Sequence, residues 1–296
     1  MCICLKGQTL EDMNRLDRFL TLSLFRPLSI LLQHKGLRIP ILMYHSVSSD
    51  REEGIHPYYK VATAASVFDE HMKFLAGQAY QVINLDMAVD ILNRHGDHEK
   101  QNVGAKYAVI TFDDGYQDYY TQAFPILERY KFTATVFLPT DYIGRSFKEK
   151  LCLTWNQVRE LRRYGHYIGS HTATHPQLQK LPRMVVREEL RSSKKQIEDA
   201  LGEPISAFSY PFRFPEQDRK FVDLLKDEMK SAGYKVGVTT IIGRADIGIE
   251  PLFLKRLPAN SSDDPALLEA KLKGSYDLMH VAQYAAKSAK KIFRLD

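Results

Sequence analysis

The sequence predicts an α/β protein in which a parallel sheet is covered by crossover helices. Two observations lead to this fold class: short apolar segments rich in β-forming residues recur along the chain, and the segments between them return apolar residues every three or four positions. With 296 residues, the chain is long enough to bury a core of ordinary size, as one barrel or as two smaller domains.

Seven apolar segments are predicted to be strands, and helical periodicity predicts the helices that separate them. The strands are expected at Ile39–His45, Tyr80–Leu85, Tyr107–Phe112, Thr133–Leu138, His166–Ser170, Ala207–Tyr210 and Tyr234–Thr240. The helical pattern is found at Val67–Leu75, Ala123–Tyr130, Gln157–Tyr164, Val185–Leu201 and Phe221–Ala232. Such helices would cover the outside of a barrel. Because we find no domain boundary and no internal repeat, we expect a single barrel domain over residues 39–260.

Helical extensions are expected on both sides of this domain, at residues 1–38 and 261–296. The N-terminal one contains the apolar segment Phe19–Leu32, which is interrupted by Arg26 and Pro27 and is shorter than the ~20 residues needed to cross a bilayer. This segment is expected either to pack on the barrel or to contact a membrane surface peripherally. In the C-terminal extension, Asp264 before Pro265 is typical of a helix start.

Charge and cysteine usage limit the partners and the compartment. The formal net charge is +5, but basic and acidic residues are interleaved, so no nucleic-acid partner is expected. Three cysteines do not indicate a disulfide framework. Acidic residues precede the first apolar segment and no small-residue cleavage site follows it, which argues against a secretory signal. We therefore expect a cytoplasmic or peripherally membrane-associated protein, and its oligomeric state stays open.

The first chemical motif, Thr111-Phe112-Asp113-Asp114-Gly115, stands where an apolar strand ends. Two adjacent carboxylates repel each other, and side chains that point in different directions can divide their work, one binding a cation and the other accepting a proton. Gly115 would let the backbone turn close to the site. Alone, the motif is also typical of an ordinary turn.

A second motif, Ser170-His171-Thr172-Ala173-Thr174-His175, follows another predicted strand. Histidines four residues apart can face the same side of a turn and share a metal ion. Together with one carboxylate they provide the three ligands of an open catalytic site, which leaves positions for water and for a substrate oxygen.

The segments TFDDG, SHTATH and SYPFR resemble the motifs of the polysaccharide deacetylases of carbohydrate esterase family 4. The resemblance runs in order from about Ile39 to Pro258. It implies a distorted (β/α) barrel of about seven parallel strands, a divalent metal that is usually Zn²⁺, and hydrolysis of N-acetyl groups on an amino-sugar glycan. The expected substrate is a polysaccharide or a lipid-linked oligosaccharide.

The resemblance also implies roles for individual residues. Asp113 would be the general base, while Asp114, His171 and His175 would bind the metal. Metal-bound water has a pKa of about 7, and Asp113 would take its proton. The backbone N–H of Phe212 would stabilise the oxyanion, with Tyr210 beside the substrate.

Two departures from the family pattern concern the base and the acid. Ser209 and Arg213 stand where many members have Arg and Gly, so Arg256 is a candidate to orient Asp113, although it also fits an exposed strand end. Arg213 would narrow the cleft or contact an anionic part of the substrate.

The usual late histidine motif is missing, and His280 lies in a helical context beyond the expected barrel. His45, in an early MYH segment, resembles the acid of one family branch. Trp155 would either stack on a sugar or pack in the core.

Two other functions stay open at this point. The same scaffold could hydrolyse a small cyclic amide or ureide, or it could be a non-catalytic glycan-binding or assembly protein whose third motif is altered. The complete Asp-His-His ligand set favours the deacetylase.

Overall fold

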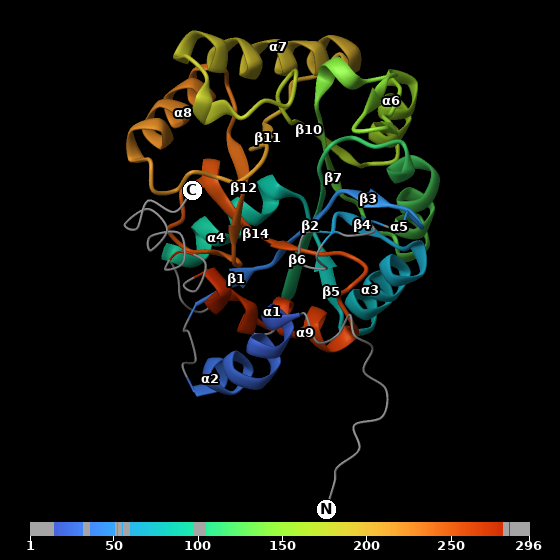
Figure 1. Cartoon of the computed structure of the whole chain (residues 1–296), viewed down its shortest axis with the longest axis vertical. Helices are drawn as coiled ribbons and strands as arrows, with labels where there is room; N and C mark the ends of the chain where they lie inside the picture. Colours follow the sequence, from blue (N-terminus) through green and yellow to red (C-terminus); the bar gives the residue numbers. More distant parts are fainter. Residues whose placement is uncertain are drawn as a thin grey trace, which may run out of the picture.

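The computed structural model describes residues 15–31, 36–50, 52, 55, 60–97, 105–280 and 284. At its centre, seven parallel strands form a closed ring, and helices surround it (Figure 1). In ring order the strands are β2 (Ile41–Tyr44), β6 (Lys106–Phe112), β7 (Thr135–Leu138), β10 (Tyr167–Ser170), β11 (Ala207–Ser209), β12 (Val236–Ile242) and β14 (Leu254–Pro258). The ring closes because β2 pairs with both β6 and β14. The predicted distorted barrel of about seven strands is confirmed.

One strand of the ring differs from those predicted. The segment Tyr80–Leu85 forms β5 (Tyr80–Val82), which pairs with the start of β6 outside the ring, and then enters helix α4 (Leu85–Asp97). The seventh ring strand is β14 instead. Its apolar pattern is broken by Lys255 and Arg256, and Arg256 is fully buried. A hydrophobicity pattern cannot identify a strand whose buried residue is charged.

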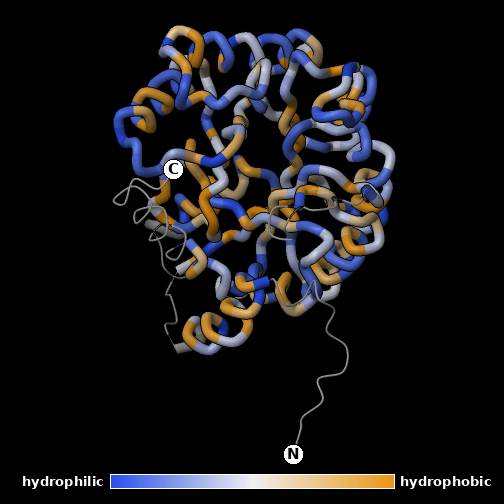
Figure 2. The backbone as a smooth tube through the Cα atoms, viewed as in Figure 1, coloured by the Kyte–Doolittle hydropathy of each residue, from blue (hydrophilic) through white to orange (hydrophobic). Residues whose placement is uncertain are grey.

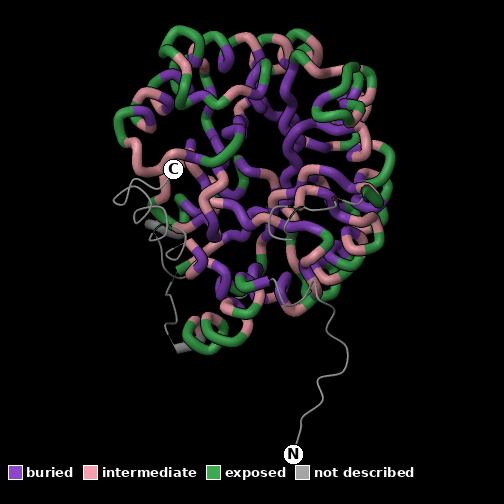
Figure 3. The backbone as a smooth tube through the Cα atoms, in the orientation of Figure 1, coloured by how far each residue is buried: buried purple, intermediate pink, exposed green. Residues whose placement is uncertain are grey.

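The five predicted helices are all present outside the ring, and their ends follow local signals. They are α3 (Ala65–Gly77), α5 (Phe124–Tyr130), α6 (Trp155–Arg163), α7 (Arg183–Leu201) and α8 (Arg219–Ser231). Helix α6 begins with a capping box, in which the Thr154 and Gln157 side chains each accept from the other's backbone N–H. Figure 3 shows the buried residues concentrated on the central strands, and Figure 2 shows outer helices that alternate between hydrophobic and hydrophilic residues. The helices therefore cover the strands with one face each.

Short elements connect these units. Paired short strands are β1 (Arg38–Ile39) with β13 (Ala245–Asp246), β3 (Ser46–Val47) with β4 (Ala62–Thr63), and β8 (Ser146–Phe147) with β9 (Lys150–Leu151). Single helical turns are η4 (Tyr119–Ala123), η5 (Thr140–Tyr142), η6 (Leu178–Lys180) and η7 (Pro251–Phe253). The β8–β9 pair is a hairpin that reaches the site described below.

The N-terminal and C-terminal segments pack against each other. The first comprises α1 (Leu16–Phe19), η2 (Leu20–Phe25) and α2 (Arg26–Leu31), and it contacts α9 (Pro265–Lys273) and η8 (Ser275–Leu278). The predicted cap of α9 is present, because the Asp264 carboxylate accepts from the Leu267 N–H. Parts of the two expected helical extensions, residues 1–14, 32–35, 281–283 and 285–296, lie outside the described residues.

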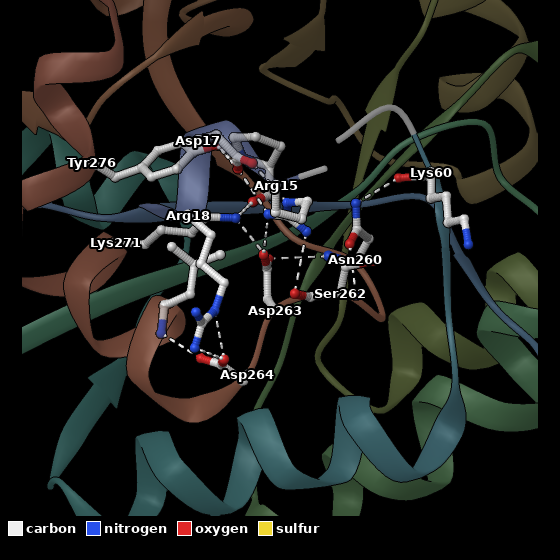
Figure 4. Close-up of polar contacts among 12 residues, drawn as sticks. Arg15, Asp17, Arg18, Lys60, Asn260, Ser262, Asp263, Asp264, Lys271 and Tyr276 are labelled. Atoms are coloured by element: carbon white, nitrogen blue, oxygen red, sulfur yellow. Dashed lines mark hydrogen bonds and ion pairs between the residues drawn. The ribbon is translucent and has the colours of Figure 1, made fainter. Parts of the chain in front are cut away.

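A buried polar network fastens the N-terminal segment to the C-terminal one (Figure 4). Arg15 binds Asp17 at 2.7 Å and Asp263 at 3.4 Å. Asp263 also binds the Lys271 ammonium at 2.7 Å, and the Tyr276 hydroxyl donates to Asp17. Burial by itself would raise the pKa of Asp17, but the contact with Arg15 brings that pKa below its usual range. The Asp17 carboxylate therefore stays charged and paired with Arg15 at neutral pH.

Candidate active site

Asp113 and Asp114 lie at the carboxyl end of β6, and both side chains are buried. The Asp113 N–H donates to the Tyr44 carbonyl at 3.0 Å, so the first aspartate still continues the sheet. The chain then turns through the left-handed region, with φ of 68° at Asp114 and 59° at Gly115. A Cβ atom on Gly115 would lie 2.9 Å from Leu138, so a larger residue would not fit this turn.

His171 and His175 follow β10, the strand next to β7 in the ring. The Nδ1 of His171 lies 2.8 Å from the Ser209 carbonyl, which can only accept. Nδ1 is therefore the protonated nitrogen, and the lone pair of Nε2 is left for a metal. The loop between the two histidines is held by Glu189 of α7, whose carboxylate accepts from the N–H groups of Ala173 and Thr174 at 2.9 Å each.

The two imidazoles converge on one oxygen of Asp114. Its Oδ1 lies 3.5 Å from Nε2 of His171 and 3.2 Å from Nε2 of His175, and the three ligand atoms all fall within 4.8 Å of one another. Two imidazole nitrogens and one carboxylate oxygen are a donor set that suits zinc and related divalent ions. The residues present therefore fit a catalytic metal, and the predicted ligands are brought together.

Asp113 does not belong to this group of ligands and forms a buried ion pair with Arg256. The guanidinium binds both carboxylate oxygens, Nη1 to Oδ1 at 2.8 Å and Nη2 to Oδ2 at 2.7 Å, and its Nε donates to the Thr239 carbonyl at 2.9 Å. Burial by itself would raise the pKa of Asp113, but Arg256 lowers that pKa to about 2. Asp113 is thus ionised and held in one orientation.

Ser209, which replaces the arginine of the family pattern, takes part in this pair. Its hydroxyl donates to Asp113 Oδ1 at 3.1 Å and accepts from Arg256 Nη2 at 3.0 Å. An arginine arriving from β14 therefore occupies the space that a larger residue at position 209 would need.

His45 follows β2 and is partly exposed. Burial lowers the pKa of its imidazole below the usual value, and the nearby carboxylates of Asp114 and Asp113 offset only part of that effect. The register of the sheet pairs Tyr44 of β2 with Phe112 of β6, so His45 and Asp113 follow neighbouring strand ends at the same end of the barrel. His280 is not part of the ligand cluster; its Nε2 lies 3.6 Å from a carboxylate oxygen of Glu216.

A groove of about 990 Å³ opens beside the histidines. Its lining includes Tyr210, Phe212 and Arg213, together with Gln177, Lys180 and Glu216. The ring of Phe212, a lining residue, lies 4.6 Å from that of His175, centroid to centroid, so the groove lies next to the ligand cluster. Trp155 is not among the lining residues; it begins α6 and packs against the main hydrophobic cluster.

Backbone strain marks the same region. Besides Asp114, left-handed backbone angles are found at Thr172 with φ of 68°, His175 with 55° and Phe212 with 60°, and also in the β8–β9 turn at Lys148 and Glu149. Such angles cost about 1–3 kcal/mol each and persist where the surroundings impose them, commonly at functional sites.

Three supporting residues were not anticipated from the sequence. Glu189 holds the histidine loop, and Tyr116 and Lys148 both contact the second oxygen of Asp114. Tyr116 directly follows the Asp-Asp-Gly turn in the sequence, so its position near Asp114 could have been predicted. Glu189 and Lys148 come from an amphipathic helix and a short hairpin, where charged residues are ordinary.

The chain is similar in sequence to known polysaccharide deacetylases. The sequence profile described as Polysaccharide deacetylase matches residues 100–237. YxkH of Bacillus subtilis, whose name assigns it to the polysaccharide deacetylases, is 33% identical over 212 residues, which are 71% of this chain and 67% of that protein. The chain belongs to the polysaccharide deacetylase family. Members are metal-dependent hydrolases that act on carbon–nitrogen bonds other than peptide bonds.

Other deacetylases support the same family. The structure of the Streptococcus pyogenes deacetylase PplD in complex with acetate superimposes with a TM-score of 0.67 and 25% identity, covering 80% of this chain and 99% of PplD. The poly-β-1,6-N-acetyl-D-glucosamine N-deacetylase of Escherichia coli is 27% identical over 143 residues, which are 44% of this chain but only 20% of that enzyme. The profile match includes the Asp113–Asp114 and His171–His175 motifs of this deacetylase, whereas His45 and Arg256 lie outside it.

Proposed function

We propose that this deacetylase removes N-acetyl groups from an amino-sugar glycan, with a divalent metal, most suitably Zn²⁺, held by Asp114, His171 and His175. The observation that carries the proposal is the convergence of these three ligand atoms beside an ionised, arginine-bound Asp113. When bound, the metal would supply acidified water and polarise the amide carbonyl. The chain's own side chains then have to move protons and position the sugar.

Asp113 is proposed as the proton acceptor. Each carboxylate oxygen has two lone pairs, so Asp113 can accept a proton while the ion pair with Arg256 persists. A carboxylate with a pKa of about 2 is a weak base, but it is ionised at every pH at which the enzyme would work. The role of Arg256 is to keep that carboxylate oriented.

The leaving amine needs a proton, because an amide anion is too basic to depart. His45 is proposed as its donor, since it shares the carboxyl end of the barrel with Asp113 and Asp114. The N–H of Phe212 is proposed for the oxyanion, and Tyr210 and Arg213 for the sugar chain in the groove. The contact between the rings of Phe212 and His175 supports this assignment, and Tyr210 and Arg213 line the same groove as Phe212. No contact favours a sugar-stacking role for Trp155.

The proposed substrate class is supported by what two of the relatives are named for or were solved with. The E. coli relative is named for deacetylation of poly-β-1,6-N-acetyl-D-glucosamine, and PplD was solved with acetate, the product that N-deacetylation releases. An open groove next to the ligand cluster suits an extended glycan better than a small cyclic amide.

Acetate release from a panel of N-acetylated glycans, with purified protein, tests the proposal. Release should require Zn²⁺ or a similar ion and stop when a chelator is added. Hydrolysis of cyclic amides or ureides instead would favour the alternative hydrolase, and tight glycan binding without any turnover would favour the non-catalytic alternative.

His45→Ala is expected to keep its metal and its fold and to lose turnover by roughly 10²–10⁴, the range for loss of a general acid. His280→Ala is the histidine control and should leave kcat nearly unchanged, because His280 is not part of the ligand cluster; KM is measured as well, since its neighbour Glu216 lines the groove. Steady-state kinetics and metal analysis of both variants check this. Unchanged rates in His45→Ala would leave the acid unidentified.

Arg256→Met is expected to lower kcat/KM by roughly 100-fold, because Asp113 loses its fixed orientation. Burial, no longer opposed by Arg256, should raise the pKa of Asp113, so the acidic limb of the pH profile should move to higher pH. The free energy of unfolding should fall by about 3–5 kcal/mol, since a buried carboxylate loses its partner. Arg162→Met, a partly exposed arginine paired with Glu203, is the control. An unshifted pH profile would argue against the orienting role.

We also propose that the N-terminal segment contacts a membrane surface and makes this a peripheral membrane protein of the cytoplasm. Leu16, Phe19, Leu24 and Leu28 are exposed on α1, η2 and α2, while the opposite side packs on η8 and α9. Among the described residues, no helix is long and apolar enough to span a bilayer.

Sedimentation with phosphatidylglycerol-containing vesicles tests the membrane proposal. Replacing Phe19 and Leu24 by Ser should weaken binding at least tenfold, because each large side chain contributes about 1.5–3 kcal/mol when fully buried. Met184→Ser, which changes an equally exposed side chain on α7, should have no effect. Vesicle binding that is absent, or equal in all variants, would contradict the proposal.

A further inference from the structure

The two oxygens of Asp114 have different neighbours. Oδ1 faces the imidazoles of His171 and His175, whereas Oδ2 accepts from the Tyr116 hydroxyl at 3.0 Å and from the Lys148 ammonium at 3.3 Å. The ligand set leaves Oδ2 unused. Two protein donors therefore act on the metal-binding carboxylate from the side away from the histidines.

The two donors differ in burial and in charge. Tyr116 is neutral and 3% exposed, and burial raises the pKa of its hydroxyl, so it stays a hydrogen-bond donor. The Lys148 side chain is positively charged and 52% exposed, and its 3.3 Å contact is long for a charge-assisted hydrogen bond. Tyr116 is thus the better orienting group, and Lys148 acts chiefly through its charge.

The β8–β9 hairpin holds the ammonium in this place. Lys148 and Glu149 occupy its turn with φ of 48° and 65°, the left-handed pair typical of a tight two-residue hairpin. On one side Lys150 binds the Ser46 hydroxyl at 2.6 Å and Asp50 at 2.8 Å. The Lys148 ammonium itself lies 4.6 Å from the centre of the Phe147 ring. These contacts fasten the hairpin over the ligand cluster.

We propose that Lys148 is a built-in charge that weakens metal binding at Asp114, while Tyr116 strengthens it by holding the carboxylate with Oδ1 towards the histidines. The inference rests on the proposed metal site. A cation next to a ligand carboxylate repels a divalent ion and draws electron density from the ligand oxygen. A bound ion would consequently keep more of its positive charge for the substrate carbonyl. Both residues are positioning residues in this view.

Zinc dissociation constants, measured by competition with a chromophoric chelator, test the two opposite effects. Lys148→Met should bind zinc about three- to tenfold more tightly, the size expected for one unit charge near a divalent ion in largely aqueous surroundings. Lys148→Arg should match the wild type. Tyr116→Phe should bind zinc roughly tenfold more weakly. Lys195→Met, which removes an exposed charge on α7, is the control and should match the wild type.

Ionic strength separates the charge effect from the orienting effect. The advantage of Lys148→Met should shrink at high salt, because screening weakens an exposed charge, whereas the defect of Tyr116→Phe should persist. Zinc binding by Lys148→Met that is unchanged or weaker than in the wild type overturns the inference. A wild type that binds no zinc refutes the proposed metal site itself, so the two failures are distinguishable. Met tolerates the same turn geometry as Lys, and circular dichroism verifies that each variant is folded.

Discussion

Asp113→Asn is expected to lose turnover by roughly 10²–10⁴ while it keeps its metal, because the amide cannot accept the proton that general base catalysis requires. The substitution preserves the size of the side chain but leaves the buried Arg256 charge uncompensated, so the free energy of unfolding should also fall by about 3–5 kcal/mol and thermal unfolding has to be measured alongside. Asp113 does not belong to the group of converging ligand atoms, which are those of Asp114, His171 and His175. Steady-state acetate release and elemental analysis of the same preparation measure both properties.

Two further variants distinguish loss of the base from loss of the metal and from a neutral change. Asp114→Asn should weaken metal binding as well as turnover, since Oδ1 of Asp114 faces both imidazoles. Asp141→Asn, an exposed aspartate on η5, should behave like the wild type. If Asp113→Asn retained full activity, Asp113 would be removed from the mechanism.

His171→Ala and His175→Ala are expected to lose the metal and, with it, all measurable deacetylation. Each supplies one of only two imidazole nitrogens in the ligand cluster, and a site with two remaining protein ligands holds a divalent ion far less tightly. The wild type should contain about one divalent ion per chain, which elemental analysis measures.

A histidine outside the ligand cluster provides the control for these two variants. His280→Ala removes a histidine paired with Glu216, outside the ligand cluster, and its metal content should equal that of the wild type. Equal metal content in all four proteins would refute the metal assignment, whether that content were one or zero. Thermal unfolding of each variant would show whether the fold survives.

Much of this barrel follows from local sequence patterns. Alternating apolar and helical segments are local properties, so the ring strands β2, β6, β7, β10, β11 and β12 and the five helices were all predicted close to their positions. The ligand candidates were also readable, because each motif is contiguous and stands at a strand end. Parallel strands bring such ends together at one rim of a barrel, which makes Asp114 and His171 neighbours.

Tertiary structure decided what no local pattern contains. The strand β14 was missed because its inward residue is Arg256, and a buried arginine is tolerated only where a distant carboxylate, here Asp113, compensates its charge. The contact of Lys148 with Asp114 likewise depends on a hairpin folding back over the rim. Hydrophobic periodicity encodes which face of a segment is buried, but the pairing of charges far apart in sequence is determined only once the barrel has closed.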